Sequence, residues 1–218
     1  MSIMPRKPKK LLYQLQHNLV INLGKEPYKR IFNAQDLDEL NQDIGVDGKQ
    51  LTDRDGRLVV SFKQPNTIVV AKGYRWDGCS PKFHILDLFW IGTPDGIIIG
   101  SERPLCRPDE DRDIPIIHER VTHKASCVHD VLGYCKYDQD MPRLFRADTS
   151  LGRQESAKSY GRRNRDKLFR EMLRHQDHSL WRVYWLAVST LGTLFNLIPF
   201  LNTANHPKNV LNACKPIE

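Results

Sequence analysis

The stretch RLVVSFKQPNTIVVAK, residues 57–72, decides the fold class because it predicts two strands joined by a turn. Its apolar runs, residues 58–60 and 68–70, consist of leucine and β-branched residues, and β-branched residues favour strands. Between the runs, residues 64–66 include proline and asparagine, which turns prefer. The stretch therefore predicts a β-hairpin.

C-terminal to the hairpin, apolar residues recur at helical spacing and predict three helices. We expect them at about residues 122–135, 155–175 and 181–191, the last beginning near Ser179 as its N-cap. Residues 34–45 show the same spacing in the N-terminal half. Because the strands precede the helices, the sequence predicts an α+β fold, with a hairpin or small antiparallel sheet packed on a C-terminal three-helix unit.

The length of 218 residues fits one domain with extensions. We assign residues 26–195 to this domain, residues 1–25 to a basic N-terminal extension and residues 196–218 to a C-terminal tail. Within the domain, residues 84–117 contain several prolines and glycines and an acidic run. They predict a long irregular insertion that is a lid or a disordered loop.

The formal net charge of +7 favours an anionic substrate or surface as partner. Much of the excess lies in the N-terminal tail and in the helix predicted at 155–175, but basic helices are usually solvated faces, so nucleic-acid binding is not expected. Five cysteines without regular spacing argue against a disulfide framework and for a reducing compartment. With no signal-peptide pattern at the N-terminus, we expect a cytoplasmic protein.

Residues 183–201 contain no charged side chain and approach the length that spans a bilayer. Polar residues and Pro199 within this stretch favour a different interpretation, in which residues 181–191 form a buried core helix and an apolar tail follows. An exposed tail would make a peripheral membrane contact or a partner contact.

The polar pair His129–Asp130 borders the apolar stripe of the helix predicted at 122–135. Histidine transfers protons near neutral pH, and histidine with carboxylates suits a divalent metal. Asp166 lies on the core-facing stripe of the next helix, where a carboxylate needs a partner. Its candidate partners are His129 on the facing helix and three arginines of its own helix, Arg162, Arg163 and Arg170. Two interpretations stay open: Asp166 orients a catalytic imidazole, or the cluster is a structural network.

The hairpin leads into the segment WDGCSP, residues 76–81, which places small polar side chains on a loop. Loops of this kind often carry binding groups. The loop makes Asp77 and Ser80 candidates for a binding site.

Four motifs in order resemble an uncharacterised bacterial and phage family, catalogued as domain of unknown function 1353. That family combines a T-D-x-x-S-x-P loop after a strand, an A-x-x-H-D helix, an R-x-x-x-D helix and an apolar helix of the Y-x-A-V-x-x-x-G kind. The matching segments here are residues 76–81, residues 126–130, Arg162 with Asp166, and residues 184–192. The loop departs from the pattern, because tryptophan replaces the threonine and the residue between serine and proline is missing.

The resemblance implies one shared polar site built from the loop and two helices. Its predicted catalytic residues are His129, Asp130 and Asp166. Its predicted substrate-binding residues are Asp77, Ser80 and Arg162, and Asp77 and Asp130 are the predicted ligands of one divalent cation.

Two functions are compatible with this site. The first is a phage-type hydrolase in which His129 is the general base for water, acting on a cell-wall, lipid or phosphoester substrate. The pair is similar to that of secreted phospholipases A2, although Ala125 and Ser126 replace their cysteines, and to that of HD-type phosphohydrolases, whose further histidine would be His118 or His123. The second is a non-catalytic phage or host accessory protein, with a structural polar cluster and a contact surface made by the basic helix and the apolar C-terminus.

Overall fold

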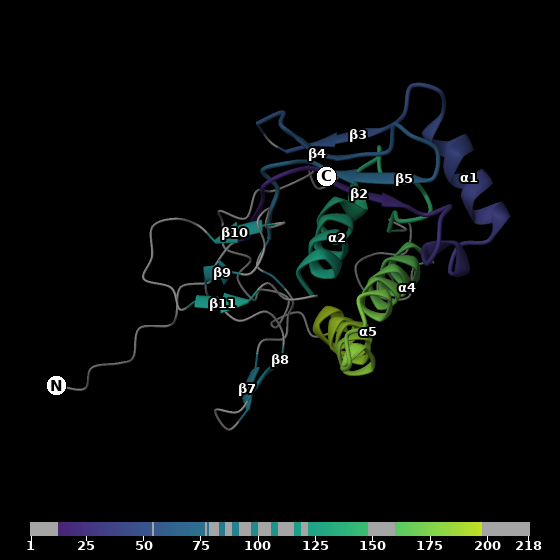
Figure 1. Ribbon diagram of the computed structural model, residues 1–218. Coiled ribbons are helices and arrows are strands. Elements are labelled where there is room, and N and C mark those ends of the chain that lie inside the picture. Colours follow the sequence, from purple (N-terminus) through teal and green to yellow (C-terminus); the bar gives the residue numbers. More distant parts are fainter. Residues whose placement is uncertain are drawn as a thin grey trace.

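In the computed structural model, short strands precede three long helices, which is the predicted α+β arrangement (Figure 1). The structure describes residues 13–53, 55–76, 78, 83–85, 89–91, 97–99, 106–108, 116–118, 122–147 and 160–197. The helix α1 (Ala34–Ile44) and the 3-10 turn η1 (Tyr28–Arg30) lie among the strands. The helix predicted at residues 34–45 is thereby confirmed, and it begins with a capping box between Asn33 and Asp36.

Four strands form an antiparallel sheet of order β2-β5-β4-β3, which lies above the C-terminal helices in Figure 1. Its strands are β2 (Leu19–Asn22), β3 (Gln50–Thr52), β4 (Leu58–Ser61) and β5 (Thr67–Val70). The predicted hairpin is confirmed as β4 and β5, with Val60 opposite Val70. Alternation along β2 buries Leu19 and Ile21 and leaves Val20 exposed, so the sheet packs one face on the core.

The remaining strands are short. The strand β1 (Tyr13–Leu15) pairs antiparallel with β6 (Arg75–Trp76) and with β10 (Cys106–Pro108). The other strands are β7 (Phe83–Ile85), β8 (Phe89–Ile91), β9 (Ile97–Ile99) and β11 (Ile116–His118). The interpretation of residues 84–117 as irregular throughout was therefore wrong. Three-residue strands carry too little periodicity to be recognised, and the β9–β11 pairing joins segments far apart in sequence.

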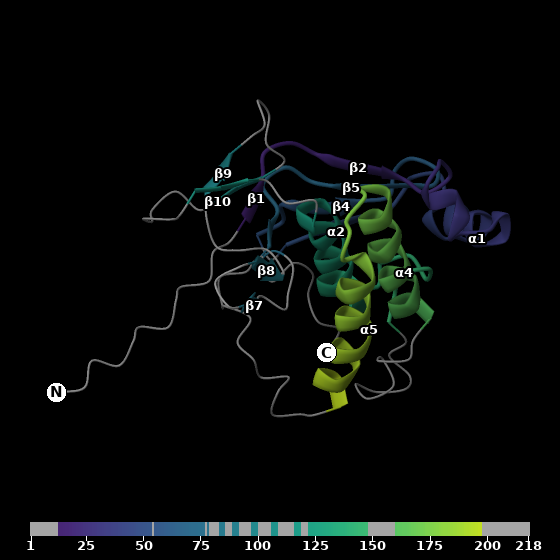
Figure 2. The same cartoon turned by 60° about the horizontal axis from the view of Figure 1, so that its bottom comes forward.

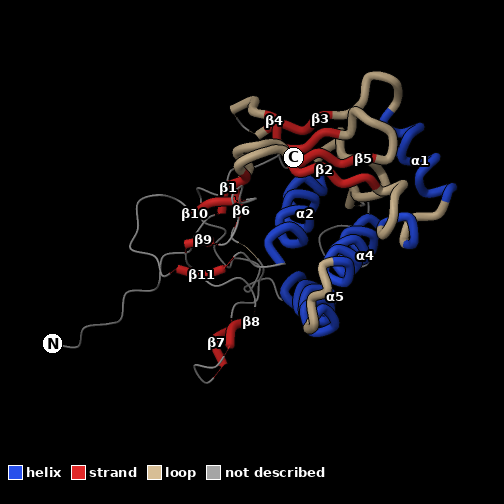
Figure 3. The backbone as a smooth tube through the Cα atoms, viewed as in Figure 1, coloured by secondary structure: helices blue, strands red, loops and turns tan. Residues whose placement is uncertain are grey.

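The three C-terminal helices lie in two layers beneath the sheet (Figures 2 and 3). They are α2 (Thr122–Tyr134), which continues into the 3-10 turn η2 (Cys135–Tyr137), α4 (Tyr160–His175) and α5 (Trp181–Leu197). The helices α2 and α4 pack on each other next to the sheet, and α5 packs on α4 on the side away from the sheet. Residues 155–159, where the second helix was predicted to begin, lie outside the described residues.

The helix α5 is not the buried core helix that its composition predicted. Tyr184 is buried, whereas Val183 is 46% and Leu186 is 56% exposed. Among the described elements, α5 packs on α4, on the side of α4 away from the sheet. Within the described part of the chain, no helix has both the length and the apolar character needed to cross a membrane.

Two cysteines of the α2 region differ in state. Cys127 is a buried thiol, whereas Cys135 is in a disulfide whose other half lies outside the described side chains. Cysteine pairing requires Cα atoms within about 7 Å, a condition that sequence spacing does not reveal. Because Cys135 is in a disulfide, the spacing of the cysteines no longer supports a reducing compartment.

Candidate functional site

A polar cluster centred on His129 joins α2, α4 and α5. His129 Nε2 lies 3.0 Å from Asp166 Oδ1, which connects α2 to α4. An ionised carboxylate can only accept, so Nε2 carries the proton of this hydrogen bond. The imidazole also lies against the ring of Phe169, with 5.2 Å between the ring centroids. Packing and the hydrogen bond together fix the orientation of the imidazole.

Asp130 lies at the other edge of the imidazole. His129 Nδ1 is 3.8 Å from Asp130 Oδ1, which is too long for a direct hydrogen bond but close enough for electrostatic attraction. The side chains of His129 and Asp130 are 25% and 22% exposed, respectively. The imidazole is thus held between two carboxylates and remains within reach of solvent.

Arg162 connects Asp166 to α5. Its Nε lies 3.6 Å from Asp166 Oδ2, and its Nη2 donates to the main-chain oxygen of Val188 at 3.4 Å. The ion pairs described for Asp166 are thus with His129 and Arg162; the other predicted partners, Arg163 and Arg170, form none with it in the described structure. The structure therefore brings His129, Asp130, Asp166 and Arg162 together.

The two carboxylates set the protonation of His129. Burial lowers the pKa of the imidazole, but the hydrogen bond to Asp166 and the negative charges of the nearby Asp130 and Asp166 carboxylates outweigh it and raise the pKa above 6.5. For Asp166, burial raises the pKa, but the hydrogen bond from His129 and the charges of His129, Arg162 and Arg165 bring it below 3.8. Imidazolium and carboxylate thus stabilise each other.

Buried polar residues next to Asp166 hold α4 in register with α2. Arg165 Nη1 donates to the main-chain oxygens of Leu132, in the last turns of α2, and of Phe145, at 3.1 and 3.2 Å. Asn164 Nδ2 donates to the oxygen of Leu144 at 2.9 Å. These bonds give the buried polar side chains of Arg165 and Asn164 partners among the main-chain oxygens of other segments. Neither residue was among the predicted site residues, although both lie beside Asp166 on the core-facing side of the helix.

The predicted loop residues Asp77 and Ser80 lie outside the described residues. The residue before them, Trp76, is buried, and its Nε1 donates to Ser126 Oγ at 3.1 Å. Ser126 lies about one helical turn before His129 on α2. The strand that leads into the predicted loop is therefore anchored close to the His129 cluster.

No group of three or more histidine, cysteine, aspartate or glutamate side chains suited to a metal ion occurs among the described residues. His123 is fully buried with its ring centroid 4.7 Å from that of Tyr13, and it precedes His129 by about 9 Å along the helix axis. The side chain of His118 and the predicted metal ligand Asp77 lie outside the described part, so the divalent cation stays a prediction.

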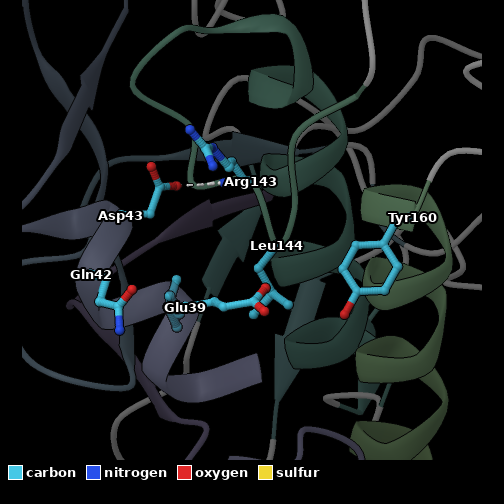
Figure 4. Close-up of a pocket in the computed structure, with 7 residues that line it drawn as sticks. Glu39, Gln42, Asp43, Arg143, Leu144 and Tyr160 are labelled. Carbon is cyan, nitrogen blue, oxygen red and sulfur yellow. Dashed lines mark hydrogen bonds between the residues drawn. The ribbon is translucent and has the colours of Figure 1, made fainter. Parts of the chain in front are cut away.

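A pocket of about 430 Å³ lies elsewhere, between α1, the turn that follows η2 and the start of α4 (Figure 4). Its lining is formed by Glu39, Leu40, Gln42, Asp43, Arg143, Leu144 and Tyr160. Asp43 accepts from the main-chain nitrogen of Arg143 at 2.7 Å and from Lys49 Nζ at 3.0 Å. Burial raises the pKa of Asp43, but these bonds and charges outweigh it and lower the pKa below 3.8. Asp43 thus connects α1 to the turn through a hydrogen bond. The residues that line the pocket include no histidine or cysteine.

No family model, curated protein or solved structure matches the chain. The resemblance to domain of unknown function 1353 therefore stays a prediction. The geometry of the His129 cluster is the basis for inferring a function.

Proposed function

We propose that the protein is a hydrolase in which His129 activates a water molecule and Asp166 orients the imidazole. The observation that carries this proposal is the 3.0 Å contact between His129 Nε2 and Asp166 Oδ1. A carboxylate bound to Nε2–H selects the tautomer whose free lone pair is on Nδ1. Nδ1 is then the basic atom of the site.

The 3.8 Å separation between His129 Nδ1 and Asp130 Oδ1 suits one bridging water. A water molecule about 2.8 Å from each atom can donate one O–H to Nδ1 and the other to the carboxylate. As the water oxygen attacks an ester or phosphoester centre, Nδ1 takes its proton and the leaving-group bond breaks. The imidazolium, stabilised by Asp166 and Asp130, then returns the proton to the leaving group.

The remaining predicted residues have different roles in this proposal: one positions Asp166, and the others bind the substrate or a cation. Arg162, with its contacts to Asp166 and to Val188, is better suited to positioning Asp166 than to binding substrate. Asp77 and Ser80 stay proposed as substrate-binding residues, and Asp77 with Asp130 as ligands of a divalent cation. The substrate class stays a cell-wall, lipid or phosphoester compound.

One observation favours a second function, a non-catalytic accessory protein. A chain of contacts connects α2, α4 and α5, and it runs from His129 through Asp166 and Arg162 to the main-chain oxygen of Val188. Such a chain of contacts stabilises a three-helix unit without any catalysis. Loss of the His129 side chain should lower turnover if the protein is a hydrolase, and should lower only its stability if it is an accessory protein.

The test is hydrolysis of a panel of chromogenic carboxylic esters, phosphodiesters, phospholipid vesicles and purified cell wall, with and without Mg²⁺, Ca²⁺ or Zn²⁺. The variant His129→Ala is expected to lower kcat by about 10²–10⁴-fold on any substrate that the wild type hydrolyses. The rate should rise with pH through the raised pKa of His129, because only the neutral imidazole accepts a proton. The matched control is His175→Ala, which removes an exposed histidine at the end of α4.

Turnover by His129→Ala at the wild-type rate would refute the catalytic role. If no substrate of the panel is hydrolysed by the wild type while His129→Ala lowers the melting temperature, the accessory function is favoured instead.

A further inference from the structure

The exposed face of α4 is a basic stripe. Four cationic residues recur there at spacings of four, three and four: Arg163, Lys167 and Arg174 are exposed, and Arg170 is half-buried. The acidic residues of α4, Asp166 and Glu171, are both buried, and of the two only Glu171 pairs with the stripe, 3.1 Å from Arg174. The stripe therefore presents a largely uncompensated positive charge to solvent.

The adjacent helix α5 presents apolar side chains to solvent. Leu180, just before the helix, is 37% exposed, and Val183 and Leu186 are 46% and 56% exposed. They recur every three residues, so they lie along one side of the helix. Apolar side chains gathered in this way mark a contact surface, because their exposure to water is unfavourable.

Two tryptophans connect the basic stripe with α5. The guanidinium of Arg170 lies over the ring of Trp185 at 5.6 Å, and those of Arg174 and Arg182 lie over the ring of Trp181 at 5.3 Å each. Figure 2 shows α4 and α5 side by side. The basic stripe thus contacts the tryptophans of α5, the helix that also carries the exposed aliphatic side chains, and we call these basic, aromatic and aliphatic side chains together the α4–α5 surface.

We propose that the α4–α5 surface docks on an anionic lipid bilayer, with α5 lying in the interface. The observation is the juxtaposition of the basic stripe with the exposed Leu180, Val183 and Leu186 through Trp181 and Trp185. Anionic headgroups complement the arginines and lysine, and the acyl region takes up the aliphatic side chains. Tryptophan and arginine have an apolar body and a polar end, which suits the boundary between the two.

The charge balance supports a bilayer over other partners. The described parts of α4 and α5 have no exposed carboxylate, and the nearby acidic residue Asp177 lies in the linker between them. A nucleic acid would match the basic stripe but leave Val183 and Leu186 in water. A second copy of this chain would place one basic stripe against another.

The test is co-sedimentation of the full chain with two kinds of vesicle. One kind is made of phosphatidylcholine alone, and the other is an equal mixture of phosphatidylcholine and the anionic phosphatidylglycerol. Binding is expected only to the anionic vesicles and should weaken as salt is added. The double variant Arg163→Gln with Lys167→Gln should bind roughly 30-fold more weakly, because each cation near an anionic surface contributes about fivefold. Leu186→Gln should bind about tenfold more weakly, because it removes buried apolar area.

The matched control is the double variant Lys25→Gln with Lys29→Gln, which makes the same change of charge at exposed residues near η1. It should alter binding by less than about threefold, and all variants should keep the wild-type melting temperature since the residues are exposed. Equal weakening by the control, or unchanged binding of Leu186→Gln, would overturn the proposal.

Two further outcomes would also overturn it. One is tight binding of an oligonucleotide that is weakened by Arg163→Gln with Lys167→Gln but not by Leu186→Gln. The other is a lipid-free dimer that Leu186→Gln converts to a monomer, which would assign the surface to self-association.

Discussion

Replacing Asp166 by asparagine tests the electrostatics of the His129 cluster. The variant Asp166→Asn keeps the size of the side chain but removes the charge that faces His129 Nε2 at 3.0 Å and Arg162 Nε at 3.6 Å. The carboxylate is 13% exposed, so solvent screens these contacts only in part. A charge-assisted hydrogen bond of this kind contributes about 1.5–3 kcal/mol, and we expect a loss of about 2 kcal/mol in the free energy of unfolding near pH 5.5.

The loss should depend on pH in a defined direction. The pKa of His129 is raised on folding, so its contribution to stability is complete below 6.5 and is lost as the pH rises through the folded-state pKa. The pKa of Asp166 is lowered on folding, so its contribution is present above 3.8 and is lost as the pH falls through the folded-state pKa. The destabilisation by Asp166→Asn should therefore be greatest between about pH 4 and 6.5 and smaller at pH 9.

The assay is urea unfolding of wild type and variant at pH 5.5 and pH 9, together with NMR titration of the His129 imidazole. The variant should lower the pKa of His129, because one of its two neighbouring carboxylates is lost. Asp47→Asn, at an exposed position, is the control and should change neither quantity. Equal destabilisation at both pH values, together with an unchanged His129 pKa, would refute the charge coupling.

Two further predictions concern the anchoring of α4. Gly161→Ala should lower the free energy of unfolding by about 3 kcal/mol or more, because the added Cβ would lie 2.2 Å from the main-chain oxygen of Arg146. The control is Gly133→Ala in α2, where the added Cβ meets no atom within 4 Å. Because alanine favours a helix more than glycine does, this change should raise the melting temperature. A similar effect of both changes would contradict the steric argument. Arg165→Met should cost about 2–3 kcal/mol in urea unfolding, because two buried carbonyls lose their donor, and a neutral result would show that they find other partners.

Most of the secondary structure was predictable because its signals are local. The hairpin at residues 57–72 and the helices at 34–45 and 122–135 depend on β-branched runs, turn residues and helical spacing within each segment. The structure places β4, β5, α1 and α2 at those segments. The strands β1, β2, β3 and β6 and the short strands between residues 83 and 118 were not predicted, since each depends on a partner strand for its hydrogen bonds.

Part of the candidate site was predictable for a related reason. His129 and Asp166 each border an apolar stripe, and stripes of two neighbouring helices face one another, so their polar members can meet. The core-facing position of Arg165 and Asn164 can be read from the sequence, but their carbonyl partners in other segments cannot. Their partners are determined by how the helix ends and the turn at residues 141–147 pack.

The sequence by itself determined the hairpin, the helices and the polar pair His129–Asp130, because each follows from side-chain periodicity within a few turns of chain. Only the tertiary structure decided that Asp166 and Arg162 complete the cluster, that α5 is a surface helix and that Cys135 is in a disulfide. These features depend on which segments lie side by side. The same apolar helix is core or surface according to how many of its sides the neighbouring elements cover, and α5 packs on α4 while its Val183 and Leu186 are exposed.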